Sequence, residues 1–193
     1  MPIKRGKNIS QNEGNLAIQA QDWNVTGFQG VQVMSRAYMK NGEKQRSFIV
    51  FENDATDDRP FTNKSSLTVP KELFETLESE REQQRLSFVV FRKTSLFQTP
   101  DRNTERKINS FIIAASVKGL EVKKLTEPVE MVYSPLVEPG KDETPICVFW
   151  DFKLNNGQGD WSESGCDYKG INNGLVNCHC YHLTNIAMMT VNL

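Results

Sequence analysis

The sequence predicts a mainly β fold, a twisted β-sandwich with one or two short helices, and two observations carry that prediction. First, five short stretches are rich in β-branched and aromatic residues and are bounded by Gly, Asn, Asp or Pro, which is typical of strands. Second, helical character is confined to one stretch. The length of 193 residues suits one domain with a proper core. The strand-like stretches are residues 31–34, 47–51, 86–91, 110–117 and 129–133.

The exception is the stretch 71–84, which we expect to form a short, mostly solvated helical connector. Pro70 stands just before it, where proline favours a helix start. Leu73, Phe74 and Leu77 form one apolar patch, and the remainder is largely charged.

Polar segments separate the expected strands. The clearest are residues 53–60 and 137–145, both rich in turn-forming residues. The first is acidic and has the oxygen ligands that calcium prefers, but we interpret it as a solvated loop.

Charge and hydropathy exclude two classes of protein. The 23 Lys and Arg residues nearly balance the 24 Asp and Glu residues and form no basic stripe, so nucleic acid is not an expected partner. No apolar run approaches the roughly 18 residues of a membrane-spanning helix. Residues 1–6 lack the apolar core of a signal peptide.

Three N-glycosylation sequons begin at Asn8, Asn24 and Asn63, and none has proline in the middle. Sequons are weak signals alone. Together with clustered cysteines, which persist as disulfides in oxidising compartments, they favour an extracellular glycoprotein. Beside these signals, the missing signal peptide suggests a piece of a longer secretory-pathway protein.

All four cysteines lie within 38 residues, together with both histidines and two of the three tryptophans. Cys178 and Cys180 are one residue apart, so in a strand their sulfurs leave the same face and cannot bond to each other. Each needs Cys147 or Cys166 as partner, and the residues alone leave both pairings open. A zinc site that includes His179 or His182 is the alternative, but it lacks a Cys-x-x-Cys pair.

Trp150 and Trp161 are interpreted as core residues that hold the last hairpin rigid. The combination of the cysteine spacing, these two tryptophans and the tripeptide 182–184 resembles the G-protein-coupled receptor proteolysis site (GPS), which ends the GAIN domain of adhesion G-protein-coupled receptors. Residues 86–91 followed by 95–97, and then residues 108–110 and 125–129, look like strands of the GAIN β-sandwich, subdomain B.

The resemblance implies a domain organisation and a disulfide pairing. Residues 1–20 would be an N-terminal remnant or linker, residues 21–193 the GAIN sandwich, and residues 147–193 the GPS motif with the final strand. Cys147 would pair with Cys178, and Cys166 with Cys180, so the C-terminal hairpin would be clamped by disulfides.

The resemblance also implies a single self-cleavage between Leu183 and Thr184, with no cofactor and no metal. If residues 178–184 formed one regular strand, His182 and Thr184 would share a face with their Cα atoms roughly 6.5 to 7 Å apart. His182 could then act as the base and Thr184 as the nucleophile. His179 would face the opposite side and is the poorer candidate. Such a protein is not a turnover enzyme.

The segment after the expected cut resembles the family's tethered agonist, although Ile186 stands where the family usually has an aromatic residue. The implied partners are the protein's own seven-transmembrane domain and extracellular protein ligands, at the outer face of the plasma membrane, in signal transduction by a receptor. The agonist residues would be Thr184, Asn185, Ile186, Ala187, Met188 and Met189.

Two alternatives remain open from the sequence. One is a GAIN domain with a structural or ligand-binding role that never cleaves. The other is the GPS-containing domain of a polycystin-like channel, which the four-cysteine pattern and residues 185–187 disfavour.

Overall fold

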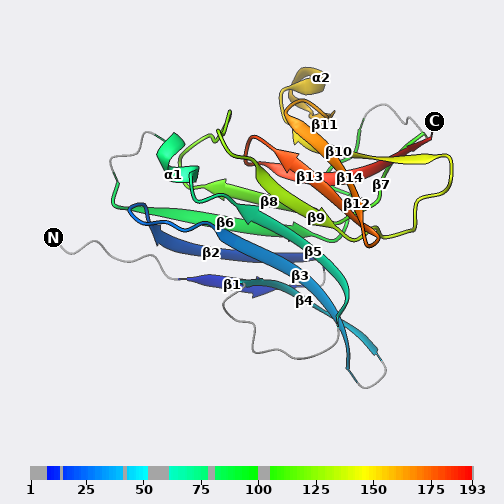
Figure 1. Ribbon diagram of the computed structural model, residues 1–193, viewed down its shortest axis with the longest axis horizontal. Coiled ribbons are helices and arrows are strands. Elements are labelled where there is room, and N and C mark those ends of the chain that lie inside the picture. The colour runs from blue at the N-terminus through cyan, green and yellow to red at the C-terminus, as the bar shows by residue number, and fades with distance from the viewer. Residues whose placement is uncertain are drawn as a thin grey trace.

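The computed structural model describes residues 8–13, 15–40, 43–51, 61–77, 81–99 and 105–192, and it confirms the β-sandwich. Two antiparallel sheets pack face to face, and the last strand of the chain lies inside one of them (Figure 1). Two short helical turns, α1 at Leu73–Thr76 and α2 at Leu154–Gly157, lie outside the sheets. Neither helix is long or apolar enough to cross a membrane.

The eight-stranded sheet has the order β1-β2-β6-β8-β14-β10-β11, and β7 pairs with β14 beside this path. Its final strand, β14, has β10 on one side and both β7 and β8 on the other. The strands are β1 (Ile9–Asn12), β2 (Leu16–Asn24), β6 (Gln83–Phe91), β7 (Arg106–Ile108), β8 (Ile112–Val117), β10 (Glu143–Asp151), β11 (Asp160–Ser162) and β14 (Asn185–Asn192).

The six-stranded sheet has the order β12-β13-β9-β5-β3-β4. Its centre is β9, which pairs with β13 on one side and β5 on the other. The strands are β3 (Val31–Lys40), β4 (Glu43–Phe51), β5 (Phe61–Val69), β9 (Val129–Tyr133), β12 (Cys166–Asn172) and β13 (Leu175–Cys180).

The main core lies between the sheets because alternate residues of the strands point inward. In β6 the inward residues Leu86, Phe88 and Val90 are almost completely buried. A second apolar cluster, which includes Phe97, Trp150, Trp161 and Met189, packs separately from the main one.

Among the described residues of the stretch 71–84, the helical prediction holds only for Leu73–Thr76. The helix is the single turn Leu73–Thr76, and Gln83 already begins β6, where it pairs with Asn24. Leu73 and Phe74 are buried in the main core, so this turn is no solvated connector. Helix propensity contributes little free energy per residue, so pairing of residues 83–85 with β2 outweighs the helical preference of the polar residues in this stretch.

The sandwich also begins earlier than residue 21, where we expected its boundary. Strands β1 and β2 occupy residues 9–12 and 16–24, and β2 forms nine residue pairs with β6. Ala17 and Ala20 are buried on β2, where small side chains give little strand signal.

Of the two expected loops, the structure tests only the second. The acidic loop 53–60 falls outside the described residues. The loop 137–145 ends sooner than expected because β10 starts at Glu143, opposite Asn192 of β14.

Candidate functional site

Residues 181–184 form a crossover between the two sheets. Strand β13 ends at Cys180 in the six-stranded sheet, and β14 begins at Asn185 in the eight-stranded sheet. The expectation that residues 178–184 form one regular strand is therefore wrong. The chain must turn out of one layer and into the other, so the position of His182 relative to Thr184 depends on the crossover and not on strand periodicity.

Main-chain hydrogen bonds fix this crossover at both ends. The partners outside the crossover come from three separate segments of the chain, at residue 165, residues 122–125 and residue 115. The bonds run from Tyr181 N–H to Gly165 O (2.9 Å), Leu125 N–H to Tyr181 O (2.9 Å), Leu183 N–H to Val122 O (3.2 Å) and Ala115 N–H to Thr184 O (3.3 Å).

The peptide bond between Leu183 and Thr184 differs from the flanking main chain in its hydrogen bonding. Among the described residues, neither the Leu183 carbonyl nor the Thr184 amide takes part in a hydrogen bond. The flanking main-chain groups are thus held by hydrogen bonds, whereas the central peptide is not.

The His182 ring is packed on three sides. Its centroid lies 4.3 Å from that of Phe149, with an interplanar angle of 67°. Its Nε2 lies 4.0 Å from the Cys166 sulfur. The Cα of Gly165 faces Nδ1, because a Cβ built there would be 3.3 Å from that atom. These contacts restrict the orientation of the imidazole.

Burial lowers the pKa of His182 below its ordinary value of 6.5. The negative charge of Asp151 opposes this effect, and the positive charge of Lys123 adds to it. His182 is therefore neutral at neutral pH, which is the state in which an imidazole can accept a proton.

His182, Leu183 and Thr184 line one pocket of about 340 Å³. Charged side chains also line it: Glu121, Lys123, Lys124, Asp151 and Lys153. Lys123 forms an ion pair with Glu121 at 2.5 Å. In the described part of the chain, His182 and the Thr184 hydroxyl make no hydrogen bond to each other.

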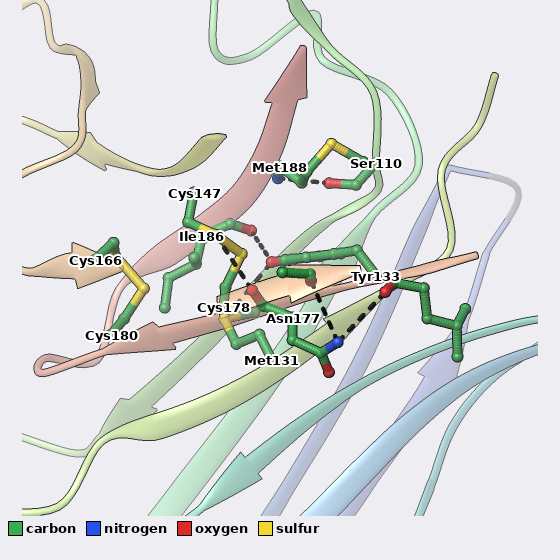
Figure 2. The surroundings of a disulfide bond; sticks show 12 residues. Ser110, Met131, Tyr133, Cys147, Cys166, Asn177, Cys178, Cys180, Ile186 and Met188 are labelled. Atoms are coloured by element: carbon green, nitrogen blue, oxygen red, sulfur yellow. Dashed lines mark hydrogen bonds between the residues drawn. A yellow bond between two sulfur atoms is a disulfide. The ribbon is translucent and has the colours of Figure 1, made fainter. Parts of the chain in front are cut away.

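Both disulfides have the pairing that the resemblance implies. The Cys147–Cys178 bond joins β10 of one sheet to β13 of the other, and Cys166–Cys180 joins β12 to β13 just before the crossover (Figure 2). Since all four sulfurs are in disulfides, the zinc alternative has no thiolate ligand.

Trp150 and Trp161 face each other across the β10–β11 pair, with ring centroids 5.4 Å apart in an edge-to-face arrangement. Both are buried. Gly159 gives Trp150 its space, because a Cβ there would lie 2.3 Å from the indole nitrogen.

Strand β14, which contains most of the expected agonist segment, is buried on both faces. Ile186 and Met188 belong to the main core, whereas Ala187 and Met189 belong to the second cluster. On the β10 side the two strands form seven residue pairs, from Glu143 opposite Asn192 to Phe149 opposite Ile186.

The other expected site residues lie at the surface or along the strands. Asn8 and Asn24 are exposed, and Asn63 lies in β5 opposite Ala37. His179 lies on the face of β13 opposite to Cys178 and Cys180.

Sequence reasoning missed the residues that hold the crossover. Val122 and Leu125 carry no motif, and their contacts join positions about sixty residues apart. In the sequence Gly165 is only a glycine beside Cys166 and Phe149 only an aromatic residue in an apolar run, and neither pattern specifies a histidine neighbour.

Comparisons with known proteins agree with this architecture. A family model described as GPS, GAIN subdomain B, matches residues 16–192. The adhesion G-protein coupled receptor G6 of Danio rerio is 28% identical over 187 residues, which cover 95% of this chain and 15% of that protein. The human adhesion G-protein coupled receptor G2 is 32% identical over 133 residues, which cover 67% of this chain and 13% of the receptor.

A solved structure, the full extracellular region of zebrafish Gpr126/Adgrg6, matches with a TM-score of 0.70 and 29% identity. The match covers 92% of this chain and 23% of that one. The chain thus spans less than a quarter of each of these relatives. It belongs to the GPS family, as a GAIN subdomain B of the adhesion G-protein-coupled receptor type.

Proposed function

We propose that this domain cuts its own main chain once, between Leu183 and Thr184, and keeps β14 in place as a concealed agonist. The observation that carries the proposal is the crossover: its flanks are held by main-chain hydrogen bonds, its central peptide is not, and a half-buried neutral histidine lines the same pocket.

The chemistry follows from a base and a hydroxyl nucleophile. His182 accepts the proton of the Thr184 hydroxyl, and the oxygen attacks the carbonyl carbon of Leu183. The five-membered tetrahedral intermediate collapses with breakage of the C–N bond, which leaves an ester between Leu183 and the Thr184 oxygen, and the amine of Thr184 takes the proton from His182. Water then hydrolyses the ester, which leaves a Leu183 carboxylate and a free threonine hydroxyl.

Positioning supplies much of the acceleration, since a peptide bond is otherwise inert. The four main-chain bonds around residues 181–184 hold the nucleophile and the carbonyl in one place and so reduce the entropy lost on reaching the transition state. The pocket gives water access for the second step, hydrolysis of the ester.

The likeness to adhesion receptors supports the remaining part of the proposal. In the full-length protein the domain would stand at the outer face of the plasma membrane, before its own seven-transmembrane domain, and would meet extracellular protein ligands. The relatives described above favour this role over a polycystin-like channel.

A non-cleaving domain is the second candidate, and one observation favours it. His182 and the Thr184 hydroxyl are not hydrogen-bonded to each other in this structure. Catalytic hydrogen bonds are often long before reaction, so the same geometry is also compatible with cleavage.

Hydroxylamine separates the two candidates, because it attacks esters far faster than peptides. We expect freshly produced chain, incubated with hydroxylamine at neutral pH, to yield a fragment ending in a Leu183 hydroxamate, identified by mass spectrometry. A chain that stays intact would support the non-cleaving role. A fragment that carries only a free carboxylate would still show cleavage, with the ester hydrolysed before hydroxylamine could attack it.

A further inference from the structure

Strand β14 meets an interrupted neighbour. Strand β8 pairs with Asn185 and Ile186, and β7 pairs with the segment 189–191. Between them the chain at residues 109–111 belongs to neither strand. There the hydroxyl of Ser110 accepts a hydrogen bond from the Met188 amide at 2.9 Å (Figure 2). A side chain therefore replaces part of the main-chain ladder.

A second side chain reaches β14 from the opposite sheet. The hydroxyl of Tyr133, at the end of β9, donates a hydrogen bond to the Ile186 carbonyl at 2.8 Å (Figure 2). Tyr133 is completely buried, and this burial raises its pKa well above the usual range. The hydroxyl therefore keeps its proton and remains a donor at physiological pH.

We propose that Tyr133 and Ser110 add side-chain recognition to the main-chain bonds that β14 makes with its neighbouring strands and with the Asn109 amide, and that these two side chains slow the departure of the cleaved strand from the sandwich. This rests on the proposed function, since only a cut strand can leave as a separate peptide. Neither residue lines the pocket at Leu183 and Thr184, so their role is distinct from the cleavage chemistry.

The physical reason is that apolar contacts of β14 oppose its departure from the sandwich but do not specify its register against the neighbouring strands. The Ile186 and Met188 side chains could be replaced by similar apolar groups, whereas a slip of one residue turns every main-chain group of a strand to the other side. Departure of the strand breaks both of these bonds: Ser110 then keeps only its bond to the Phe111 carbonyl, and the buried Tyr133 hydroxyl keeps only the weak acceptor Met131 Sδ, which disfavours the empty state.

Removal of single hydroxyls tests this proposal. In purified cleaved protein, Tyr133→Phe and Ser110→Ala should each release the peptide 184–193 about 3- to 10-fold faster in moderate urea, and the double variant should multiply the effects. Tyr168→Phe and Ser116→Ala are matched controls because both side chains are exposed. Their release rates should stay within about twofold of the parent protein, by size-exclusion chromatography with mass detection.

Amide hydrogen exchange gives a second measurement that needs no cleavage. In a chain kept uncut by Thr184→Ala, Tyr133→Phe should reduce protection at residues 186–190 by the same factor, while β2 and β6 stay unchanged. Release and exchange that match the controls would overturn the proposal, as would an equal loss of protection in every strand. An uncut parent chain would instead refute the proposed function, and exchange would still decide the role of Tyr133.

Discussion

The Cα of Gly165 lies against the ring of the expected base, and its φ of +76° is one that other residues rarely adopt. Gly174 provides a matched control, because it has a φ of +75° and no atom within 4 Å of a built Cβ. Substitution by alanine strains both positions equally, but only at Gly165 does the methyl group push on His182.

We therefore predict that Gly165→Ala loses most of its cleavage and that Gly174→Ala cleaves like the parent protein. The fraction of cut chain would be measured by intact mass after equal expression time, with a melting curve for each variant. Equal cleavage in the two folded variants would mean that the ring position is not set by Gly165.

The lowered pKa of His182 gives a prediction about pH. An imidazole accepts a proton only when neutral, so the cleavage rate should be constant above pH 7 and fall through a midpoint below 6.5. Asp151→Asn removes the charge that raises this pKa and should move the midpoint lower, whereas Lys123→Gln should move it higher.

The two histidines provide the control for this profile. His182→Ala should slow cleavage by roughly 10²- to 10⁴-fold and abolish the midpoint, while His179→Ala should keep both. A rate that does not change with pH between 5 and 8 would remove His182 as the base.

At the scale of elements, the two disulfides should have separable roles. Cys147–Cys178 closes a loop of 31 residues and Cys166–Cys180 one of 14, so the chain-entropy model gives about 4 and about 3 kcal/mol of stability. The shorter loop, however, ends at the residue just before the crossover and places Cys166 beside His182.

We predict that Cys166→Ser with Cys180→Ser impairs cleavage more, and that Cys147→Ser with Cys178→Ser lowers the melting temperature more. Urea unfolding and intact mass would report the two effects independently. If both pairs of substitutions reduced cleavage in proportion to lost stability, the Cys166–Cys180 bond would have no positional role.

Patterns of neighbouring residues in the sequence predicted those strands whose own side chains determine that they are strands. Strands β6, β8 and β9 were evident from β-branched and aromatic runs, because those side chains fill the core between the sheets. Strand β2 was missed since its two buried residues, Ala17 and Ala20, are small, and the helix was overextended since Gln83 and Gln84 pair with a strand about sixty residues earlier. The His-Leu-Thr motif marked the candidate site.

The geometry of that site could not be predicted from the motif. Strand periodicity assumes that a chain stays in one sheet, and residues 181–184 change sheets. The segments that hold them, at Val122, Leu125 and Gly165, are brought there by the whole fold.

For the whole molecule, the important fact is where the chain would be cut. The new end at Thr184 would lie between the sheets, and β14 would keep neighbours on both sides and apolar contacts on both faces. A cut at this place separates the chain covalently without opening the sandwich, so the two pieces stay together until something removes the strand.

Intact mass under denaturing conditions tests the central claim most directly. We predict that the parent chain separates into residues 1–183 and 184–193, that Thr184→Ala gives a single uncut mass with an unchanged melting temperature, and that Thr184→Ser retains cleavage because it keeps the hydroxyl. A Thr184→Ala chain that is still cut at the same bond, or a folded parent chain that remains whole, would contradict the account.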